Sequence, residues 1–443
     1  MTATLGPTSH AERIGMLDTT RGIAVLGILL MNITGFGLPN AYDDPTNWGG
    51  SEGANLAAWR LASLLFEGTM RGLFTLLFGA GALLFLQRHA ERAHGLLPAD
   101  LYFRRTIWLI AFGLINGYLL LWDGDILYTY GVVGLFLFVF RNVAPRRLVA
   151  VAAATILLQT GVTVAERAGY MELKDAAIAA EQARNAGSAL DEQQRDAIHE
   201  FQRLAQDFKP PRAHLNDLVA SMRQSYLSAF DVVSERTWHM QTAFFFRHML
   251  LESVGMMLLG MALLKMGVLT GGANVRTYAL LALVGYAVGL TVNLYEIANV
   301  EAARFSTEAI LTAYLTYDLG RIPLTLGHVG LIGLVCSSGW FAAATRTLAR
   351  VGQMALTNYL AQSVLCMFIF TGAGLAWYGQ LQRSELYYVV VAIWIVQLIW
   401  SPLWLKHFRY GPLEWVWRSL TYWQRQPLRR AAAQSEAVTQ ASL

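Results

Sequence analysis

The sequence predicts an all-α integral membrane protein, a polytopic bundle of about ten transmembrane helices with an extracytoplasmic helical insert. The first observation is the composition, because 55% of the 443 residues are hydrophobic and only 14% are charged, as in polytopic membrane proteins. The second is a series of apolar segments of the length that crosses a bilayer as a helix. The third is that arginine and lysine are abundant in every second loop and scarce in the others, which indicates loops on opposite sides of a membrane.

Residues 17–39 form the first apolar segment, and they carry polar residues on one side of the expected helix. Arg21 and Asn32 are eleven residues apart, and eleven steps of about 100° return to nearly the same face. The two side chains are therefore about 16 Å apart along that face. The face either lines a polar cavity or carries a snorkelling Arg21 and a helix-packing Asn32, and the spacing alone leaves both interpretations open.

The other apolar segments follow in order and predict nine further helices. The fourth segment is short for a span and the eighth is long, so their ends are the least defined. Cys336 and Cys366 both lie in apolar segments and are expected to be buried thiols without a disulfide. The expected spans are 19–38, 62–86, 104–122, 126–141, 147–165, 243–264, 277–297, 308–335, 354–372 and 386–405.

The distribution of arginine and lysine places both termini in the cytoplasm, in a multi-pass protein of the bacterial inner membrane. Eleven such residues lie in the loops after spans two, four, six and eight, and three lie in the alternate loops. The modest net charge of +4 is then mostly cytoplasmic surface that contacts membrane lipids, and it does not indicate nucleic-acid binding. The eleven are Arg88, Arg92, Arg104, Arg105, Arg141, Arg146, Arg147, Lys265, Arg276, Arg346 and Arg350, and the three are Arg60, Arg304 and Arg383.

Residues 166–240 are the one break in composition, rich in charged residues, glutamine and alanine. This orientation places them outside the cytoplasm as a helical insert over the outer mouth of the bundle. A helix is expected over 188–208, capped by Ser188 and ended by two prolines, and a second over 212–230. The chain thus divides into an N-terminal membrane half (1–165), the insert (166–240), a C-terminal membrane half (241–405) and a basic cytoplasmic tail (406–443).

Several segments resemble the YeiB-like family of domain-of-unknown-function 418 proteins. They include LDTTRGIAVLGILLMNI at 17–33, VGQMALTNYLAQS at 351–363 and SPLWLKHFRYGPLEWVWRSLTY at 401–422. The resemblance covers nearly the whole chain apart from roughly 165–240. It implies a relation to membrane acyltransferases, which often carry His eleven residues after an Arg in the first helix. Asn32 stands at that His position, as in the related heparan-glucosaminide acetyltransferases.

The resemblance also singles out two acidic residues. Glu67 lies where an acidic residue with a function follows the first outer loop in the acyltransferase relatives, and Asp125 lies in the family-like segment GDILYTYG at 124–131. Those relatives can carry a catalytic His in the first outer loop, whereas this chain has only Asp43 and Asp44 there. The resemblance therefore does not imply the complete catalytic mechanism of those relatives.

Two spans carry opposite charges or acid–base groups four residues apart. Glu67 and Arg71 are expected to pair on one face of the second span, either as a structural ion pair or as a substrate-binding pair. His248 and Glu252 have the spacing in which a carboxylate orients an imidazole for general-base catalysis, and a hydrogen-bonded interfacial His is the alternative. His-x-x-x-Glu alone does not indicate zinc, so we expect no metal.

Span eight is unusual because Asp318 and Arg321 lie one turn apart in an apolar segment, with Pro323 next. Rise along the helix puts Asp318 roughly 14 Å from the outer end, near the bilayer midplane, and Arg321 is its expected partner. Helices broken beside buried charges mark transporter sites as well as enzyme sites. In span nine, Asn358 and Gln362 share one face and can bond to neighbouring helices.

These observations lead to one expected function and two alternatives. We expect a membrane acyltransferase-like protein that moves an acyl group from a cytoplasmic donor, such as an acyl-CoA, to a small-molecule or lipid- or glycan-like acceptor. The alternatives are a small-metabolite transporter with a midplane Asp318–Arg321 site and a non-catalytic scaffold; the oligomeric state stays open, a homo-oligomer included. The residues assigned are Arg21 to the donor phosphate, Asn32, Glu67, His248 and Glu252 to catalysis, and Arg71, Asp125, Asp318, Arg321, Asn358 and Gln362 to substrate binding.

Overall fold

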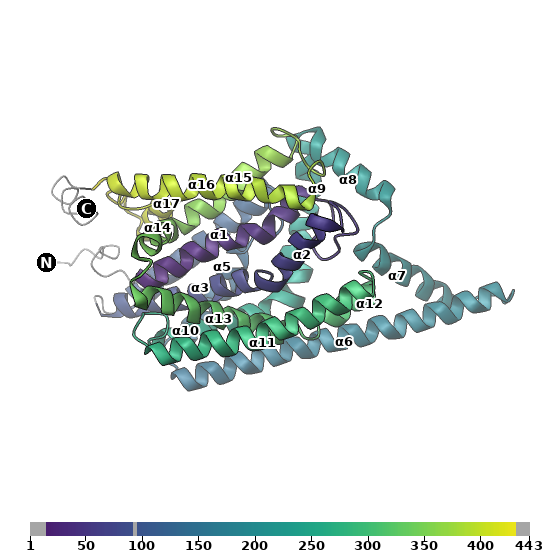
Figure 1. The fold of residues 1–443 in the computed structure, drawn as a ribbon, viewed down its shortest axis with the longest axis horizontal. Coiled ribbons are helices and arrows are strands. Elements are labelled where there is room, and N and C mark those ends of the chain that lie inside the picture. Colours follow the sequence, from purple (N-terminus) through teal and green to yellow (C-terminus); the bar gives the residue numbers. More distant parts are fainter. Residues whose placement is uncertain (1–14, 92–94, 431–443) are drawn as a thin grey trace.

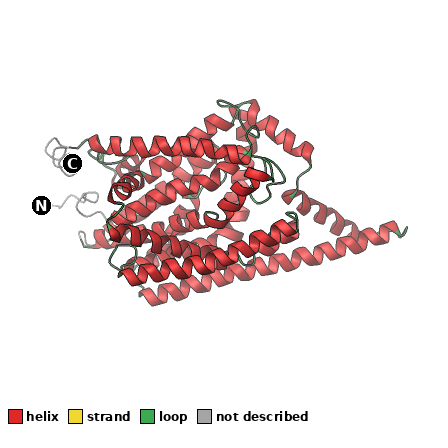
Figure 2. Cartoon of the chain, viewed as in Figure 1, coloured by secondary structure: helices red, strands yellow, loops and turns green. Residues whose placement is uncertain are grey.

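The computed structural model describes residues 15–91 and 95–430, and within them every regular element is a helix (Figure 2). One isolated antiparallel bridge joins Phe408 and Arg429. The helices in chain order are α1 (Gly15–Gly37), α2 (Gly53–Leu65), α3 (Thr69–Ala90), α4 (Leu97–Leu114), η2 (Ile115–Leu119), α5 (Leu127–Leu137), η3 (Phe138–Phe140), α6 (Pro145–Asn185), α7 (Glu192–Phe208), α8 (Arg212–Gln224), α9 (Tyr226–His239), η4 (Met240–Met249), α10 (Leu250–Lys265), α11 (Val275–Ala302), α12 (Thr307–Ala313), α13 (Tyr317–Ser338), α14 (Ala342–Gln353), α15 (Ala355–Phe370), α16 (Arg383–His407) and α17 (Pro412–Tyr422).

Among the described residues, seven helical segments are long and apolar enough to cross a membrane. An eighth is added if α14 and α15, which meet at a bend of 76°, form one broken span. The predicted spans 104–122 and 126–141 coincide with the helices α4–η2 and α5–η3, which fall outside that set. The described residues confirm the predicted all-helical architecture. The number of ten spans stays a prediction.

The outward faces of the long peripheral helices are apolar. Leu157 on α6, Leu283 on α11 and Ile399 on α16 expose 70%, 71% and 56% of their surface. Such continuous apolar exposure is unusual on a protein surrounded by water and typical of a helix surface that faces lipid. The core lies further in, around α1 and α3, where Leu29, Ile33, Leu73 and Leu76 are fully buried.

Two helix crossings position the charged residues of the bundle. At the α3–α10 crossing, a Cβ added to Gly79 would lie 2.0 Å from the Met257 carbonyl oxygen, so the two backbones touch. At the α11–α13 crossing, Gly285 and Gly289 pack against the α13 backbone and Leu324, as the four-residue spacing of two small residues allows. These close approaches bring charged side chains of neighbouring helices within reach of each other.

Two expected spans are broken where charged residues lie. The span predicted at 62–86 is interrupted between α2 and α3, because Gly68 adopts a φ of 68° that a helix cannot contain. The span predicted at 308–335 is interrupted between α12 and α13. Asp318 consequently lies in the first turn of α13 and not deep within a continuous helix.

The insert is helical as predicted, but its helix boundaries differ. One helix of 41 residues, α6, runs from the predicted fifth span to Asn185, and with α7 it extends beyond the bundle at the end opposite α14 and α17 (Figure 1). The N-cap of α7 is Asp191, which forms a capping box with Gln194, so the Ser188 cap was wrong. The single helix expected over 212–230 is two, α8 and α9, because Ser225 is extended and caps α9.

The insert is tied to the loop between α1 and α2. Asn47 donates a hydrogen bond to the Phe208 carbonyl at 2.8 Å, and Lys209 pairs with Asp44 at 2.9 Å. Of the predicted tail, residues 408–430 include α17, which packs against α4. Residues 431–443 of that tail, like Arg92, lie outside the described residues.

Candidate functional site

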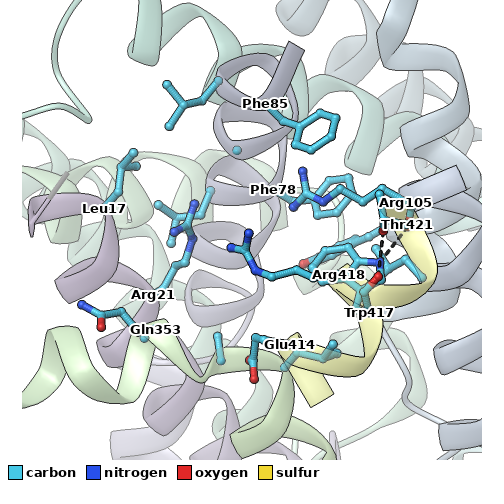
Figure 3. A pocket seen from close by; sticks show the side chains of 18 of the residues that line it. Leu17, Arg21, Phe78, Phe85, Arg105, Gln353, Glu414, Trp417, Arg418 and Thr421 are labelled. Carbon is cyan, nitrogen blue, oxygen red and sulfur yellow. Dashed lines mark hydrogen bonds between the residues drawn. The ribbon is translucent and has the colours of Figure 1, made fainter. Parts of the chain in front are cut away.

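A cavity of about 270 Å³ opens among α1, α3, α4, α5, α14, α15 and α17, near the start of α1 and the end of α3. Arginine side chains from three of these helices turn into it: Arg21 from α1, Arg105 from α4 and Arg418 from α17 (Figure 3). Arg88 and His89 at the end of α3 also line it. Asp18 and Glu414 are the acidic residues in the lining, so cationic side chains outnumber carboxylates at this end of the cavity.

The guanidinium groups are held largely by aromatic rings. Arg105 lies 4.5 Å from the ring centroid of Trp417 and 5.0 Å from that of Phe85, and Arg418 lies 4.6 Å from that of Tyr410. Within the described residues, neither arginine side chain forms an ion pair or a hydrogen bond. Stacking occupies only the face of a guanidinium, so its N–H groups, which lie in the plane, stay available to a ligand. Arg21 differs, because its Nη1 binds Asp18 at 3.0 Å. Two cations with unused donors therefore face the same cavity.

Helix α17 is fixed in place by two anchors. The buried Glu414 carboxylate accepts hydrogen bonds from the Thr357 backbone N–H at 3.1 Å and from the Thr357 hydroxyl, and burial raises the pKa of Glu414. The Trp417 indole N–H donates to the Arg105 carbonyl at 2.9 Å. These anchors position Arg418 at the cavity, which sequence reasoning missed by treating the tail and Arg105 as membrane-surface charges. The available signal was the pair of tryptophans followed directly by an arginine in EWVWRS at 414–419.

The other end of the cavity is apolar and aromatic. Phe74, Leu77 and Tyr130 line it, and Leu77 and Tyr130 are almost fully buried. Phe85, beside Arg105, and Phe74 are eleven residues apart on α3, which corresponds to about 16 Å along the helix. The cavity is therefore an elongated pocket with a cationic mouth and an apolar floor.

A second polar cluster lies on the far side of that floor, at the start of α3. Arg71 binds Glu252 of α10 at 3.0 Å and the Tyr317 hydroxyl at 3.2 Å. The Glu67–Arg71 pair predicted from helical spacing is wrong, because Glu67 lies in the break between α2 and α3. Its carboxylate instead lies 3.7 Å from Arg321.

Arg321 is the centre of the buried part of this cluster. It forms an ion pair with Glu296 of α11 and lies 4.4 Å from the Tyr317 ring centroid. Glu296 also accepts a hydrogen bond from the Thr316 hydroxyl at 2.7 Å. The predicted Asp318–Arg321 pair is wrong, since the α11–α13 crossing supplies Glu296 as a closer partner. Asp318 accepts a 3.4 Å hydrogen bond from Thr160.

The predicted His248–Glu252 pair is also wrong. Residues 240–249 form a π-helix, whose five-residue hydrogen bonding shifts the side chains out of the four-residue alignment of an α-helix. His248 faces Glu166 of α6 at 3.6 Å, whereas Glu252 pairs with Arg71. The Glu252 carboxylate and the His248 imidazole therefore contact different residues and do not form an acid–base pair.

The remaining candidates lie around these two sites. Asn32 is half-buried on α1, and no hydrogen bond of its amide is found within the described residues. Asp125 accepts hydrogen bonds from Asn116 at 2.7 Å and from the Tyr128 backbone at 2.8 Å. In the loop between α1 and α2, burial and the nearby Glu67 carboxylate raise the pKa of Asp43 to about 7.

Asn358 and Gln362 bond between helices rather than into the cavity. The Asn358 amide donates to the Val351 carbonyl at 3.1 Å, and the Gln362 amide donates to the Val25 carbonyl on α1 at 2.9 Å. Neither residue lines the cationic pocket. Across residues 15–91 and 95–430, no three His, Cys, Asp or Glu side chains are grouped as metal ligands would be.

Comparison with known proteins gives relatives but no described activity. Residues 263–424 match the family described as "Protein of unknown function (DUF418)". The chain is 30% identical to "Uncharacterized protein YeiB" of Escherichia coli strain K12 over 93% of its length and 96% of the relative's. It is 29% identical to "Uncharacterized protein YxaH" of Bacillus subtilis strain 168 over 96% and 98%. No solved structure gives a significant match.

Proposed function

The chain belongs to the DUF418 family of YeiB-like proteins, and we propose that it is a membrane acyltransferase-like protein with an acyl-CoA as its donor. The observation that carries this proposal is the elongated pocket with Arg21, Arg105 and Arg418 at its mouth and an apolar floor. An acyl-CoA has the same division, with phosphates at one end and an acyl group at the other.

The arginine mouth suits phosphate for a geometric reason. A guanidinium is planar and presents paired N–H donors that match two phosphate oxygens. Arg105 and Arg418 are stacked on aromatic rings, so their orientation is set before a ligand arrives and less entropy is lost on binding. Arg21 adds a third guanidinium at the same mouth, which suits a donor with several phosphate groups.

The cluster around Arg71 is the proposed acceptor side. Glu252, with its side chain 16% exposed, pairs with Arg71 behind the pocket floor, and it is our candidate for binding the acceptor on that side. Glu67 and Asn32 remain candidates for orienting the acceptor, whereas His248 faces Glu166. The alternative, transport of a small metabolite, needs an Asp318–Arg321 pair, whereas Arg321 pairs with Glu296 and Asp318 bonds to Thr160; no contact of the described residues favours transport over acyl transfer.

Binding to the purified protein in lipid nanodiscs tests the donor site. Acetyl-CoA and 3′,5′-ADP should both bind, and each should displace the other, since the proposed site recognises phosphates. Phosphatidylglycerol in the nanodisc carries the same phosphate chemistry and is the competing occupant. If added phosphatidylglycerol displaces acetyl-CoA only weakly, the nucleotide is the ligand; if neither nucleotide binds in discs without anionic lipid, the proposal fails.

The proposed orientation, with the arginine mouth in the cytoplasm of a bacterial inner membrane, has its own test. In a variant lacking Cys336 and Cys366, single cysteines at Ala189 or Gln206 in the insert should react with a membrane-impermeant thiol reagent in intact cells. Single cysteines at Leu96 or Gln424, both exposed and on the opposite side by the arginine distribution, should react only after lysis. Labelling of Gln424→Cys in intact cells would reverse the orientation.

A further inference from the structure

The Tyr130 ring at the apolar floor of the pocket is held by its hydroxyl, which lies between the pocket and the Arg71 cluster. The Tyr130 hydroxyl lies 2.8 Å from Thr75 Oγ1 and donates to the Arg71 carbonyl at 3.2 Å. Thr75 donates to the same carbonyl at 2.8 Å. Tyr130 is 3% exposed, so displacing its ring would leave buried polar groups without partners, at a cost of about 1–3 kcal/mol for each. The ring is therefore a fixed wall.

The distance from the arginine mouth to this wall matches one part of the proposed donor. In an extended chain, three bonds span about 3.3–3.6 Å. In coenzyme A, roughly thirteen bonds separate the sulfur from the phosphate that carries the thiol arm, so this arm spans about 15 Å. The pocket runs about 16 Å along α3 from Phe85 to Phe74. A donor with its phosphates at Arg105 thus places its thioester beside Tyr130.

Beyond the wall, the environment is unsuitable for an alkyl chain. The next groups along α3 are the Arg71 guanidinium and its partners Glu252 and Tyr317. Inserting an alkyl chain there would separate a partly buried ion pair and leave its charges unpaired, which is costly. Both the steric wall and the charges behind it therefore exclude a chain that continues past the thioester.

We propose that Tyr130 is a specificity-determining residue that restricts this protein to short-chain acyl donors such as acetyl-CoA. The inference rests on the proposed function, because it assumes that an acyl-CoA occupies the pocket. The new element is that one side chain, Tyr130, limits the length of the acyl group that the donor can carry. The aromatic ring sets the limit, and its hydroxyl holds the ring in position.

Competition binding across a chain-length series tests this assignment. Acetyl-, butyryl-, octanoyl- and palmitoyl-CoA would each displace labelled acetyl-CoA from wild-type protein in nanodiscs. We expect octanoyl-CoA to bind at least about tenfold more weakly than acetyl-CoA, which corresponds to about 1.4 kcal/mol. In Tyr130→Ala this ratio should fall to about twofold or less, because the wall is removed, while Tyr130→Phe should keep the wild-type preference.

The outcomes separate the two levels of the proposal. If wild-type protein binds no coenzyme A thioester, the proposed function fails and the inference fails with it. If it binds acetyl- and octanoyl-CoA equally, or if Tyr130→Ala folds and keeps the wild-type ratio, Tyr130 does not set chain length although the donor site stands. Should Tyr130→Ala not fold, Phe74→Ala at the same floor replaces it, with the same loss of preference expected and an unchanged ratio overturning the inference.

Discussion

Replacing Arg321 with leucine should destabilise the protein by about 3–5 kcal/mol, because the change leaves a buried carboxylate without its cation. The Glu296 side chain is only 4% exposed, and after the change it keeps the Thr316 hydroxyl as its remaining polar contact. Thermal or denaturant unfolding of the purified protein in detergent measures the cost. Arg60→Ala is the matched control: it breaks a pair between α2 and the same helix α11, but its arginine side chain is 52% exposed, so a much smaller loss of stability is expected.

A double-mutant cycle identifies the partner of Arg321. Glu296→Leu combined with Arg321→Leu should cost less than the sum of the single changes, since no bare charge is left. Asp318→Asn combined with Arg321→Leu should be additive, because Asp318 bonds to Thr160. Strong coupling to Asp318 together with additivity at Glu296 would restore the pair that helical spacing predicts and contradict the observed α11–α13 contact.

Replacing Arg105 or Arg418 with alanine should weaken acetyl-CoA binding by about ten- to a hundredfold each, since a hydrogen bond to a charged group is worth roughly 1.5–3 kcal/mol. Arg21→Ala should have a similar effect. Lysine at any of the three positions should restore only part of the affinity, because an ammonium lacks the paired donors of a guanidinium. Isothermal titration of each variant measures the loss.

The control for this series is Arg147→Ala. Arg147 lies exposed in the first turn of α6, at the same end of the bundle but outside the pocket, so its removal should change affinity by less than about twofold. Full rescue by lysine at Arg105 and Arg418 would show that these residues contribute only positive charge and not the paired donors of a guanidinium. Equal losses in Arg147→Ala would point to non-specific attraction by the basic surface.

The helical architecture was predictable because it depends on local sequence properties. Apolar length predicts spans, and the four-residue spacing of Gly285 and Gly289 allows the close helix packing that the structure shows. Helical periodicity placed Arg21 and Asn32 on one face but left open whether that face lines a cavity, and the pocket contains Arg21 and not Asn32. These inferences need no knowledge of which helices are neighbours.

The charged partners were not predictable, because they depend on which helices cross. Spacing within one helix suggested Glu67–Arg71, His248–Glu252 and Asp318–Arg321, yet a positive φ at Gly68 and a π-helix at 240–249 break the assumed register. The actual partners of Arg71 and Arg321 come from α10 and α11.

The mouth of the pocket escaped sequence reasoning for a related reason. Arg105 and Arg418 are more than 300 residues apart, and each has a local explanation as a charge at the membrane surface. Only the packing of α17 against α4, fixed by the Trp417–Arg105 hydrogen bond, brings them to the same cavity as Arg21.

The most direct measurement is a structure of the protein in nanodiscs with saturating coenzyme A, determined by electron cryo-microscopy. We predict density for the phosphates in contact with Arg21, Arg105 and Arg418, and density for the thiol arm extending along α3 to Tyr130. Coenzyme A bound elsewhere, or a lipid headgroup in the arginine mouth with the nucleotide absent, would contradict this prediction.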